Sequence, residues 1–390
     1  MNFWKLTHLK YSLLLGSILM VFSSCEPDST LPEPELDTQP SYEVGEAETE
    51  SSHKATTMGR FVTSGSGGHF TDGSGTITTQ VFWSLYESSG GKINGVTASV
   101  PADYVVVGGG ASINYGTGGG AMITESRPDV NNRSIWVASS SDFHYPNEHQ
   151  MWVYAVGMKI SGVSAATLRQ YTTVQLMGSQ RSLNPDLTFG APSGYQLLGG
   201  GVKLLSNCHN CLNIPHFVQA NYPVNANQWN VESGHVDNYV WNQIEGYAIG
   251  IKSIPGYGSV EIGFFQQGAS YNSGPTTHDY SDLPNGWVLA GAGGYTASED
   301  RFIYRMQPWN GGVSVESKDH MDVYRSGYTH AYAIGVRKPV ANACSGVSCP
   351  PGYFCNSNTG QCEYLDIGGG CIGCTPGQIC TPSGECIDAF

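Results

Sequence analysis

Short segments in which apolar and polar residues alternate follow one another along most of the chain after residue 77. Examples run from Ile135 to Ser139, from Trp229 to Ser233 and from Val313 to Ser317. Clusters of Gly, Asn and Ser separate such segments, and a two-residue period bounded by turn residues is typical of half-buried β-strands. No segment of useful length combines a helical period with a cap, so little helix is expected. The pattern predicts an all-β protein.

The same order of segments occurs three times, at intervals of about 90 residues. Each copy has a Gly cluster that ends an apolar strand, a strand that ends in Pro, an alternating strand and a closing strand that begins with Tyr-Ala. A weaker fifth strand precedes each Gly cluster. The landmarks are Gly108–Gly110, Gly199–Gly201 and Gly291–Gly294; Met122–Pro128, Phe217–Pro223 and Phe302–Pro308; Ile135, Trp229 and Val313 as aligned first residues of the alternating strands; and Tyr154, Tyr247 and Tyr332. Four aligned landmarks in three copies indicate an internal repeat.

The repeats are assigned to residues 58–160, 161–253 and 254–340. They predict three pseudo-symmetric antiparallel units, arranged either as a β-prism-like body or as tandem small sandwiches; closure would hide sheet edges. The Gly clusters are expected to allow bends or a close approach by another part of the chain. The unit resembles a recurrent secreted bacterial β module with a Gly-Gly-Gly strand end, a Trp strand and a closing Tyr-Ala strand. That resemblance implies no established activity.

The first 24 residues have the composition of a signal peptide. Lys5 and Lys10 supply positive charge, the apolar run from Leu13 to Phe22 is too short to span a bilayer, and small residues precede Cys25. A Cys directly after such a run resembles the lipobox of bacterial lipoproteins. The resemblance implies that Cys25 becomes the lipidated N-terminus of the mature chain and that the membrane is a partner through this anchor. The alternative is ordinary secretion, with Cys25 as a spare thiol.

Residues 25–57 are predicted to form an extended acidic tether. Glu26 to Glu50 contains nine acidic residues, four prolines and neither Lys nor Arg, and repelling charges with Pro prevent compact packing. Such a stretch resembles the surface-export signal of some Gram-negative lipoproteins, which implies the outer face of the outer membrane. The net charge of −14 and the absence of a basic stripe exclude nucleic acid as a partner.

Ten cysteines remain after Cys25, an even number that suits disulfides in an oxidising compartment. Eight lie in a short tail at 341–390, where two similar four-Cys units follow each other, and a segment of this size needs cross-links to hold its structure. The tail resembles EGF-like Cys-rich domains, although each unit has four Cys and not six. Zinc is the alternative for the tail, and no metal site is assigned. The predicted disulfide cysteines are Cys208, Cys211, Cys344, Cys349, Cys355, Cys362, Cys371, Cys374, Cys380 and Cys386.

Each copy places Asp and His together after its alternating strand, with aromatic residues close by. Carboxylate and imidazole groups beside an aromatic ring suit sugar binding, because sugar hydroxyls take hydrogen bonds while the apolar sugar face packs on the ring. Metal ligation is a second possibility, and a polar turn in which Asp caps its own backbone is a third. The candidate ligand-binding residues are Asp142, His144, His235, Asp237, Trp241, Asp319, His320 and Asp322.

Catalysis finds little support in the sequence. There is no Gly-x-Ser-x-Gly elbow and no His-Glu-x-x-His motif; Glu125, Glu232 and Glu316 are the acidic candidates for glycoside cleavage. No catalytic residue and no cofactor are assigned. The leading hypothesis is a lipid-anchored surface protein that binds glycans or acts as an adhesin through loops of the repeats. A docking protein that uses the Cys-rich tail is the alternative, and a secreted hydrolase is the third hypothesis.

Overall fold

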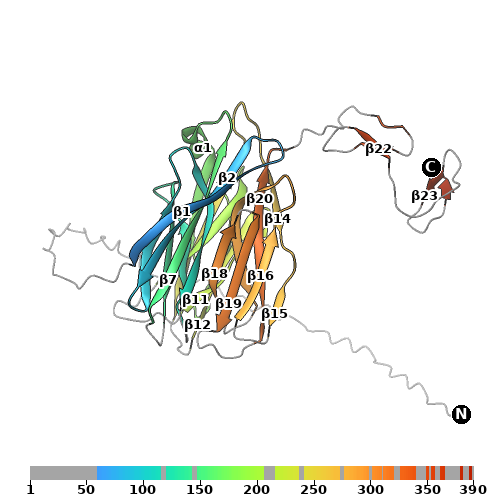
Figure 1. Cartoon of the computed structure of the whole chain (residues 1–390). Helices are drawn as coiled ribbons and strands as arrows, with labels where there is room; N and C mark the ends of the chain where they lie inside the picture. Colours follow the sequence, from blue (N-terminus) through green and yellow to red (C-terminus); the bar gives the residue numbers. More distant parts are fainter. Residues whose placement is uncertain are drawn as a thin grey trace, which may run out of the picture. The chain divides into compact units, whose positions relative to one another are not determined.

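The computed structural model describes residues 59–115, 120–142, 147–205, 216–236, 241–272, 276–297, 301–309, 311–319 and 326–339, with short stretches between 348 and 388 (Figure 1). All of them belong to one compact unit, Lys54–Phe390. Residues 1–58, with Cys25 and the tether, lie outside the described residues. Across the described part, no helix has the length and hydrophobicity needed to cross a membrane.

Most of the described residues lie in β-strands, as predicted. The first segment contains β1 (Arg60–Thr71), β2 (Ile77–Ser88), β3 (Lys92–Ser99), β4 (Val105–Tyr115), β5 (Met122–Pro128), β6 (Ile135–Ser141) and β7 (His149–Ile160). The second contains the short helix α1 (Ala165–Tyr171), β8 (Thr172–Gly178), β9 (Asp186–Gly190), β10 (Gln196–Leu205), β11 (His216–Asn225), β12 (Gln228–His235) and β13 (Gln243–Ile251). The third contains β14 (Glu261–Phe265), β15 (Ser270–Asn272), β16 (Thr276–Asp282), β17 (Val288–Thr296), β18 (Arg301–Trp309), β19 (Gly312–Asp319) and β20 (Gly327–Arg337).

Three antiparallel sheets form the body, and each takes strands from two segments. Sheet I has the order β1-β2-β7-β4-β18-β19-β16, sheet II β3-β6-β5-β10-β13-β8, and sheet III β14-β20-β17-β11-β12-β9, with β15 beside β20. The first segment gives β2, β4 and β7 to sheet I and β3, β5 and β6 to sheet II. The second gives β8, β10 and β13 to sheet II and β9, β11 and β12 to sheet III, and the third gives β14, β17 and β20 to sheet III and β16, β18 and β19 to sheet I. Each segment therefore shares one sheet with each of the other two segments, in a cyclic exchange of strands. This arrangement fits the β-prism-like alternative and excludes tandem sandwiches. The strands β3, β9 and β16 were not predicted.

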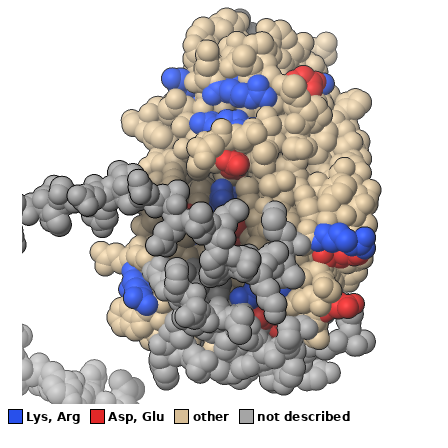
Figure 2. All heavy atoms as spheres, turned by 90° about the vertical axis from the view of Figure 1, so that its left-hand side faces the viewer, with Lys and Arg blue, Asp and Glu red and all other residues tan. Residues whose placement is uncertain are grey.

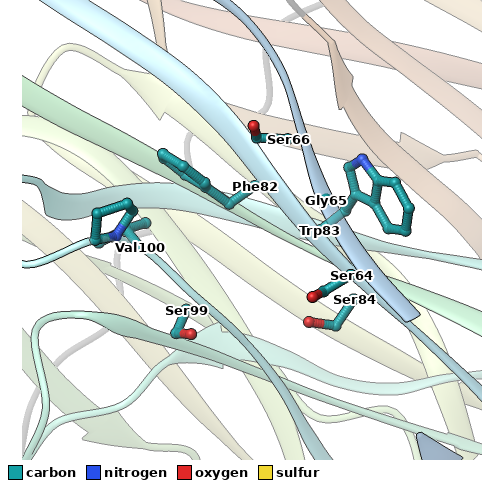
Figure 3. Close-up of a pocket in the computed structure, with 9 residues that line it drawn as sticks. Ser64, Gly65, Ser66, Phe82, Trp83, Ser84, Ser99 and Val100 are labelled. Carbon is teal, nitrogen blue, oxygen red and sulfur yellow. The ribbon is translucent and has the colours of Figure 1, made fainter. Parts of the chain in front are cut away.

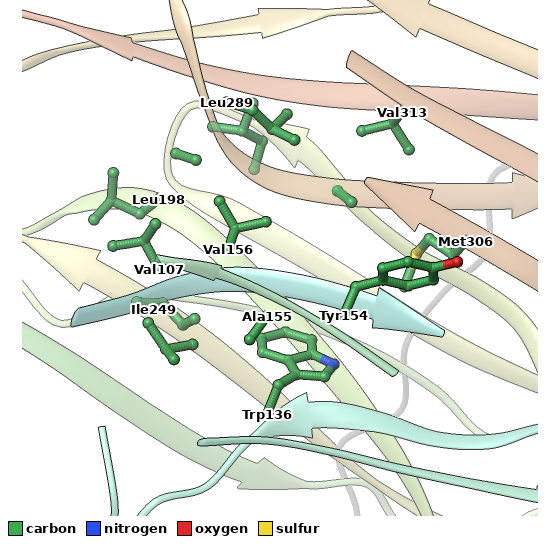
Figure 4. Close-up of a cluster of buried hydrophobic side chains, with 14 of the residues drawn as sticks. Val107, Trp136, Tyr154, Ala155, Val156, Leu198, Ile249, Leu289, Met306 and Val313 are labelled. Carbon is green, nitrogen blue, oxygen red and sulfur yellow. The ribbon is translucent and has the colours of Figure 1, made fainter. Parts of the chain in front are cut away.

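The Gly clusters lie where the three segments meet. A β-bulge precedes Gly108, Gly199 and Gly291 in their pairing with the closing strands. An added Cβ at Gly108 would lie 2.3 Å from the carbonyl oxygen of Ala290, and one at Gly199 or Gly291 would lie 2.6 Å from a carbonyl oxygen of another segment. Real Cβ atoms do not come this close, so only Gly allows the three backbones to meet here. Nearby, Val107, Leu198 and Leu289 lie in the shared core (Figure 4).

The pairing corrects one detail of the sequence alignment. The Pro at or near the end of β5, β11 or β18 pairs with Trp136, Trp229 or Val313. Trp136, and not Ile135, is thus the equivalent of Trp229; both apolar residues satisfied the local pattern, but only Trp136 is fully buried. Trp136 Nε1 donates to Ser126 Oγ (3.0 Å). This hydrogen bond satisfies the indole N–H inside the core.

The tail contains two hairpins, β21 (Tyr353–Cys355) with β22 (Cys362–Tyr364), and β23 (Gln378–Cys380) with β24 (Cys386–Asp388). A disulfide joins Cys349 to Cys362, with a Cα–Cα distance of 5.5 Å. Cys355, Cys380 and Cys386 lie on the hairpin strands. The other predicted disulfide cysteines lie outside the described residues: Cys208, Cys211, Cys344, Cys371 and Cys374.

Candidate ligand-binding site

The Asp and His residues predicted after the alternating strands occupy matching places at one end of the sheets. Asp142 follows β6, while His235 and Asp319 are the last residues of β12 and β19. Their strands pair with β5, β11 and β18 in the same register, which makes the three positions equivalent. The remaining predicted residues in these turns, His144, Asp237, His320 and Asp322, lie outside the described residues.

Burial separates these residues by role. Asp142 is 6 % exposed and Asp319 is 2 % exposed. Asp319 pairs with the buried Arg301 across β18 and β19; burial lowers the pKa of Arg301, and the charge of Asp319 opposes this. A buried carboxylate beside a buried cation has a structural role, because the two charges compensate each other inside the protein. The interpretation as a structural polar turn therefore fits Asp142 and Asp319 better than ligand contact.

The histidine that faces Asp142 is one that the sequence analysis did not single out. His149 begins β7 and is buried, with Nε2 2.8 Å from Ser140 Oγ and Nδ1 3.1 Å from the carbonyl oxygen of Asn147. Burial lowers its pKa, against the opposing effects of Asn147 and Asp142. His235 is less buried and places Nδ1 2.7 Å from Asn184 Oδ1. Of the predicted ligand-binding residues in the described ranges, Trp241 alone is strongly exposed, at 55 %.

A different feature, on the outer face of sheet III, gathers aromatic side chains. We call it the aromatic stripe, and it consists of Tyr222, Tyr271, Tyr295, Tyr328, His330 and Tyr332. These residues come from β11, β15, β17 and β20, which lie in the second and third segments. Every member with a described exposure is partly or largely exposed. The stripe therefore offers an aromatic surface to solvent on a rigid sheet.

The rings of the stripe contact one another in sequence. Tyr222 lies 5.2 Å from Tyr295 and 5.0 Å from Tyr332 between ring centroids. His330 lies 5.6 Å from Tyr295. At the end of the stripe, Tyr271 and Tyr328 pair across β15 and β20 with their centroids 4.9 Å apart. Ring contacts at these separations fix the side chains relative to one another, which lowers the entropy cost of binding.

Two carboxylates border the stripe beside Tyr222. Glu232 on β12 pairs with Asp186 on β9, and Asn230 Nδ2 donates to Asp186 Oδ1 (2.6 Å). Burial, and then the negative charge of Asp186, raises the pKa of Glu232. Glu232 in turn raises the pKa of Tyr295, after the larger effect of burial. This end of the stripe is acidic and rich in hydrogen-bond acceptors.

The equivalent face of sheet II shows that the fold does not require the stripe. Strand pairing aligns Tyr295 and His330 with Lys203 and Glu245 on sheet II, and Tyr222 aligns with Arg127. Of these positions, only that of Tyr332 holds Tyr on all three sheets. On sheet II the corresponding residues form charged contacts, such as the pair between Arg127 Nε and Glu125 Oε1 (2.7 Å). The same scaffold thus accommodates charged residues where sheet III has rings.

The sequence analysis missed the stripe, although a local signal exists. Tyr328, His330 and Tyr332 alternate with buried residues along β20, which places their side chains on one exposed face. Tyr222 and Tyr295 join them only through the pairing of β11 with β17. Among the described side chains, no three His, Cys, Asp or Glu residues gather in a way that could hold a metal ion.

A scan against protein-family models found no family that matches this chain, and a search of curated proteins found no relative.

Proposed function

We propose that this protein binds a neutral or amine-bearing polysaccharide through the aromatic stripe. The observation that carries the proposal is the presence of rings on sheet III at positions where sheet II has Arg127, Lys203 and Glu245. Divergence at equivalent positions of one scaffold is expected for a binding surface, whereas residues needed for folding would be shared. In this proposal the polysaccharide binds to the outer face of sheet III, and not to the loops that the sequence predicted.

The chemistry of the stripe suits carbohydrate. Tyrosine rings pack against the apolar faces of sugars, while the hydroxyls of Tyr and the nitrogens of His exchange hydrogen bonds with sugar hydroxyls. From Tyr328 to Tyr332 the strand rises about 13 Å, which exceeds one sugar ring, so an extended chain makes more contacts than a monosaccharide. Glu232 and Asp186 favour an amine and repel an acidic sugar. On the face that Figure 2 shows, the visible Lys, Arg, Asp and Glu side chains are separated by uncharged residues.

Removing one ring from the stripe should weaken polysaccharide binding without unfolding the protein. We expect Tyr328→Ala and Tyr295→Ala each to reduce affinity about 10-fold or more, because burying an aromatic side chain stabilises by roughly 1.5–3 kcal/mol. The probes are neutral, amine-bearing and acidic polysaccharides, measured by glycan array and calorimetry. Tyr280→Ala is the matched control, since Tyr280 is similarly exposed but lies on β16 of sheet I. Equal losses in the control, or binding to no glycan, would discard the proposal.

The competing function, protein docking through the Cys-rich tail, has its own structural support. The disulfide between Cys349 and Cys362 and the two hairpins give the tail a structure separate from the three sheets. Deleting residues 343–390 distinguishes the two functions. A polysaccharide binder that uses the stripe keeps its affinity after the deletion, while a docking protein that uses the tail loses its partner.

The proposed location is the outer face of the outer membrane, with Cys25 lipidated. We expect Cys25→Ala to move essentially all of the protein from the membrane fraction to the soluble fraction, because each buried CH₂ of an acyl chain contributes about 0.8 kcal/mol. The measurement is membrane fractionation together with mass spectrometry of the mature N-terminus. Retention of the variant in the membrane, or an unmodified Cys25 in the unchanged protein, would contradict lipid anchoring.

A further inference from the structure

Strand β1 is an addition to the threefold plan. It pairs with the outer edge of β2, whereas no described strand pairs with the outer edges of β8 and β14, which hold the equivalent places. Most side chains of β1 are exposed, so the strand contributes little to the core. Its contacts with β2 include the ring of Phe61, whose centroid lies 5.6 Å from that of Tyr86, and Gly65, where a Cβ would lie 2.5 Å from the ring of Trp83. Strand β1 therefore has a role other than completing the core.

An open groove of about 380 Å³ lies where β1 and β2 face the end of β3 (Figure 3). The register places Ser64 opposite Ser84 and Ser66 opposite Phe82, with all four on the same face of the sheet. The opposite wall contains the end of β3 and the residues that follow it, Ser99, Val100 and Pro101. Figure 3 shows the hydroxyls of Ser64 and Ser84 side by side, while Trp83 lies apart from them.

The hydroxyls in this groove are available to a ligand. Ser64, Ser84 and Ser99 make no hydroxyl hydrogen bond to any other residue that the structure describes, and Ser84 is only 8 % exposed. Ser66 Oγ accepts a hydrogen bond from Gln80 Nε2 (3.1 Å). The Ser84 hydroxyl still reaches solvent, since it is not among the fully buried hydroxyls of the described residues that lack a partner. A ligand that brings its own hydroxyls can replace water there without losing hydrogen bonds.

The composition of the groove selects the ligand class. Its lining contains no Asp, Glu, Lys, Arg or His, which leaves an ionic ligand without a counter-charge. The hydroxyls of Ser64, Ser84 and Ser99 would remain unsatisfied against an apolar ligand. The ring of Phe82 and the ring of Pro101 provide the apolar contact that a sugar face needs. The groove volume lies at the low end of the range for small-molecule sites.

We infer that the groove between β1, β2 and β3 is a second binding site, for a neutral sugar residue or the uncharged end of an oligosaccharide. The hydroxyls of Ser64, Ser84 and Ser99 bond to the sugar hydroxyls, and Phe82 packs against an apolar edge of the sugar. The inference does not depend on the stripe, since the two sites use different residues on different sheets. In this site, strand β1 forms one wall.

The test uses the full chain and a set of neutral probes: methyl hexopyranosides, maltose and cellobiose, with glucuronic acid as the charged comparison. Binding is followed by saturation-transfer NMR and calorimetry. We expect at least one neutral probe to bind and glucuronic acid not to bind. Ser84→Ala should weaken the neutral probe about fivefold, as expected for the loss of one hydrogen bond between neutral groups.

Four further variants make the result decisive. Ser84→Val fills the groove and should abolish binding, and deletion of residues 60–71 removes one wall and should do the same while the melting transition persists. Ser314→Ala is the control, because Ser314 is a partly exposed serine that does not line the groove, and three strands separate its strand, β19, from β2 in sheet I. Tyr328→Ala should leave sugar binding in the groove unchanged, which separates this site from the stripe. Failure of every neutral probe, equal binding of glucuronic acid, or unaltered binding by Ser84→Val would overturn the inference.

Discussion

Replacing Gly108 with Ala should lower the free energy of unfolding by about 3 kcal/mol or more, because the added methyl group has no space. The new Cβ would lie 2.3 Å from the carbonyl oxygen of Ala290 and 2.7 Å from the Cα of Gly291. Both contacts are with backbone atoms, which cannot move aside without shifting β17. The cost therefore extends to the place where all three segments meet.

A matched variant isolates this effect. Gly178 ends β8, its φ is not positive and a Cβ added there would have no neighbouring atom within 4 Å, so Gly178→Ala should be neutral or stabilise by up to about 1 kcal/mol. Urea denaturation followed by circular dichroism measures both variants. Similar midpoints for Gly108→Ala and Gly178→Ala would show that the close approach of the segments is not tight in solution.

Trp229→Ala should destabilise the protein by about 3–5 kcal/mol, the usual cost of truncating a buried Trp. Trp229 is fully buried, and its ring packs against Gly200, where a Cβ would lie 2.4 Å away. Its Nε1 donates to Asn221 Oδ1 (2.8 Å). The variant therefore creates a cavity and also leaves a buried amide oxygen without this donor.

The third segment suggests the companion variant. Val313 occupies the position equivalent to Trp229, so Trp229→Val introduces a residue that the same local backbone already accepts and should cost less than Trp229→Ala. Trp309→Ala serves as a surface control because Trp309 is largely exposed. The same denaturation measurement applies. An effect of Trp309→Ala as large as that of Trp229→Ala would contradict the assignment of Trp229 to the core.

Most of the strands were predictable from the sequence because their signals are local, whereas β3, β9 and β16 were not predicted. Alternation, the Gly clusters and the strand-ending Pro residues all lie within a few residues of the structure that they specify. The pairing of β4 with β18 was not predictable, since Ser112 and Arg305 are neighbours only through the exchange of strands between distant segments. The sequence left the prism-like and tandem arrangements open for the same reason.

At the predicted Asp and His turns, burial is the property that the sequence could not show. Local sequence placed Asp142, His235 and Asp319 in equivalent turns, and the structure gives them matching positions, but no local pattern states that Asp142 and Asp319 are shielded from solvent. Aromatic content was used as a hint for sugar binding. Which rings share a face depends on the pairing of β11 with β17, which brings Tyr222 to Tyr295.

The cyclic exchange of strands has a consequence for descent. A polypeptide with one unit alone would hold two half-sheets and complete neither, so an ancestor of that length would require three identical chains assembled as a homotrimer. In a homotrimer every mutation appears on all faces at once. Joining the units in one gene removes that constraint, and each face then evolves separately. Arg127 on one face and Tyr222 on another are the outcome that such a fusion permits.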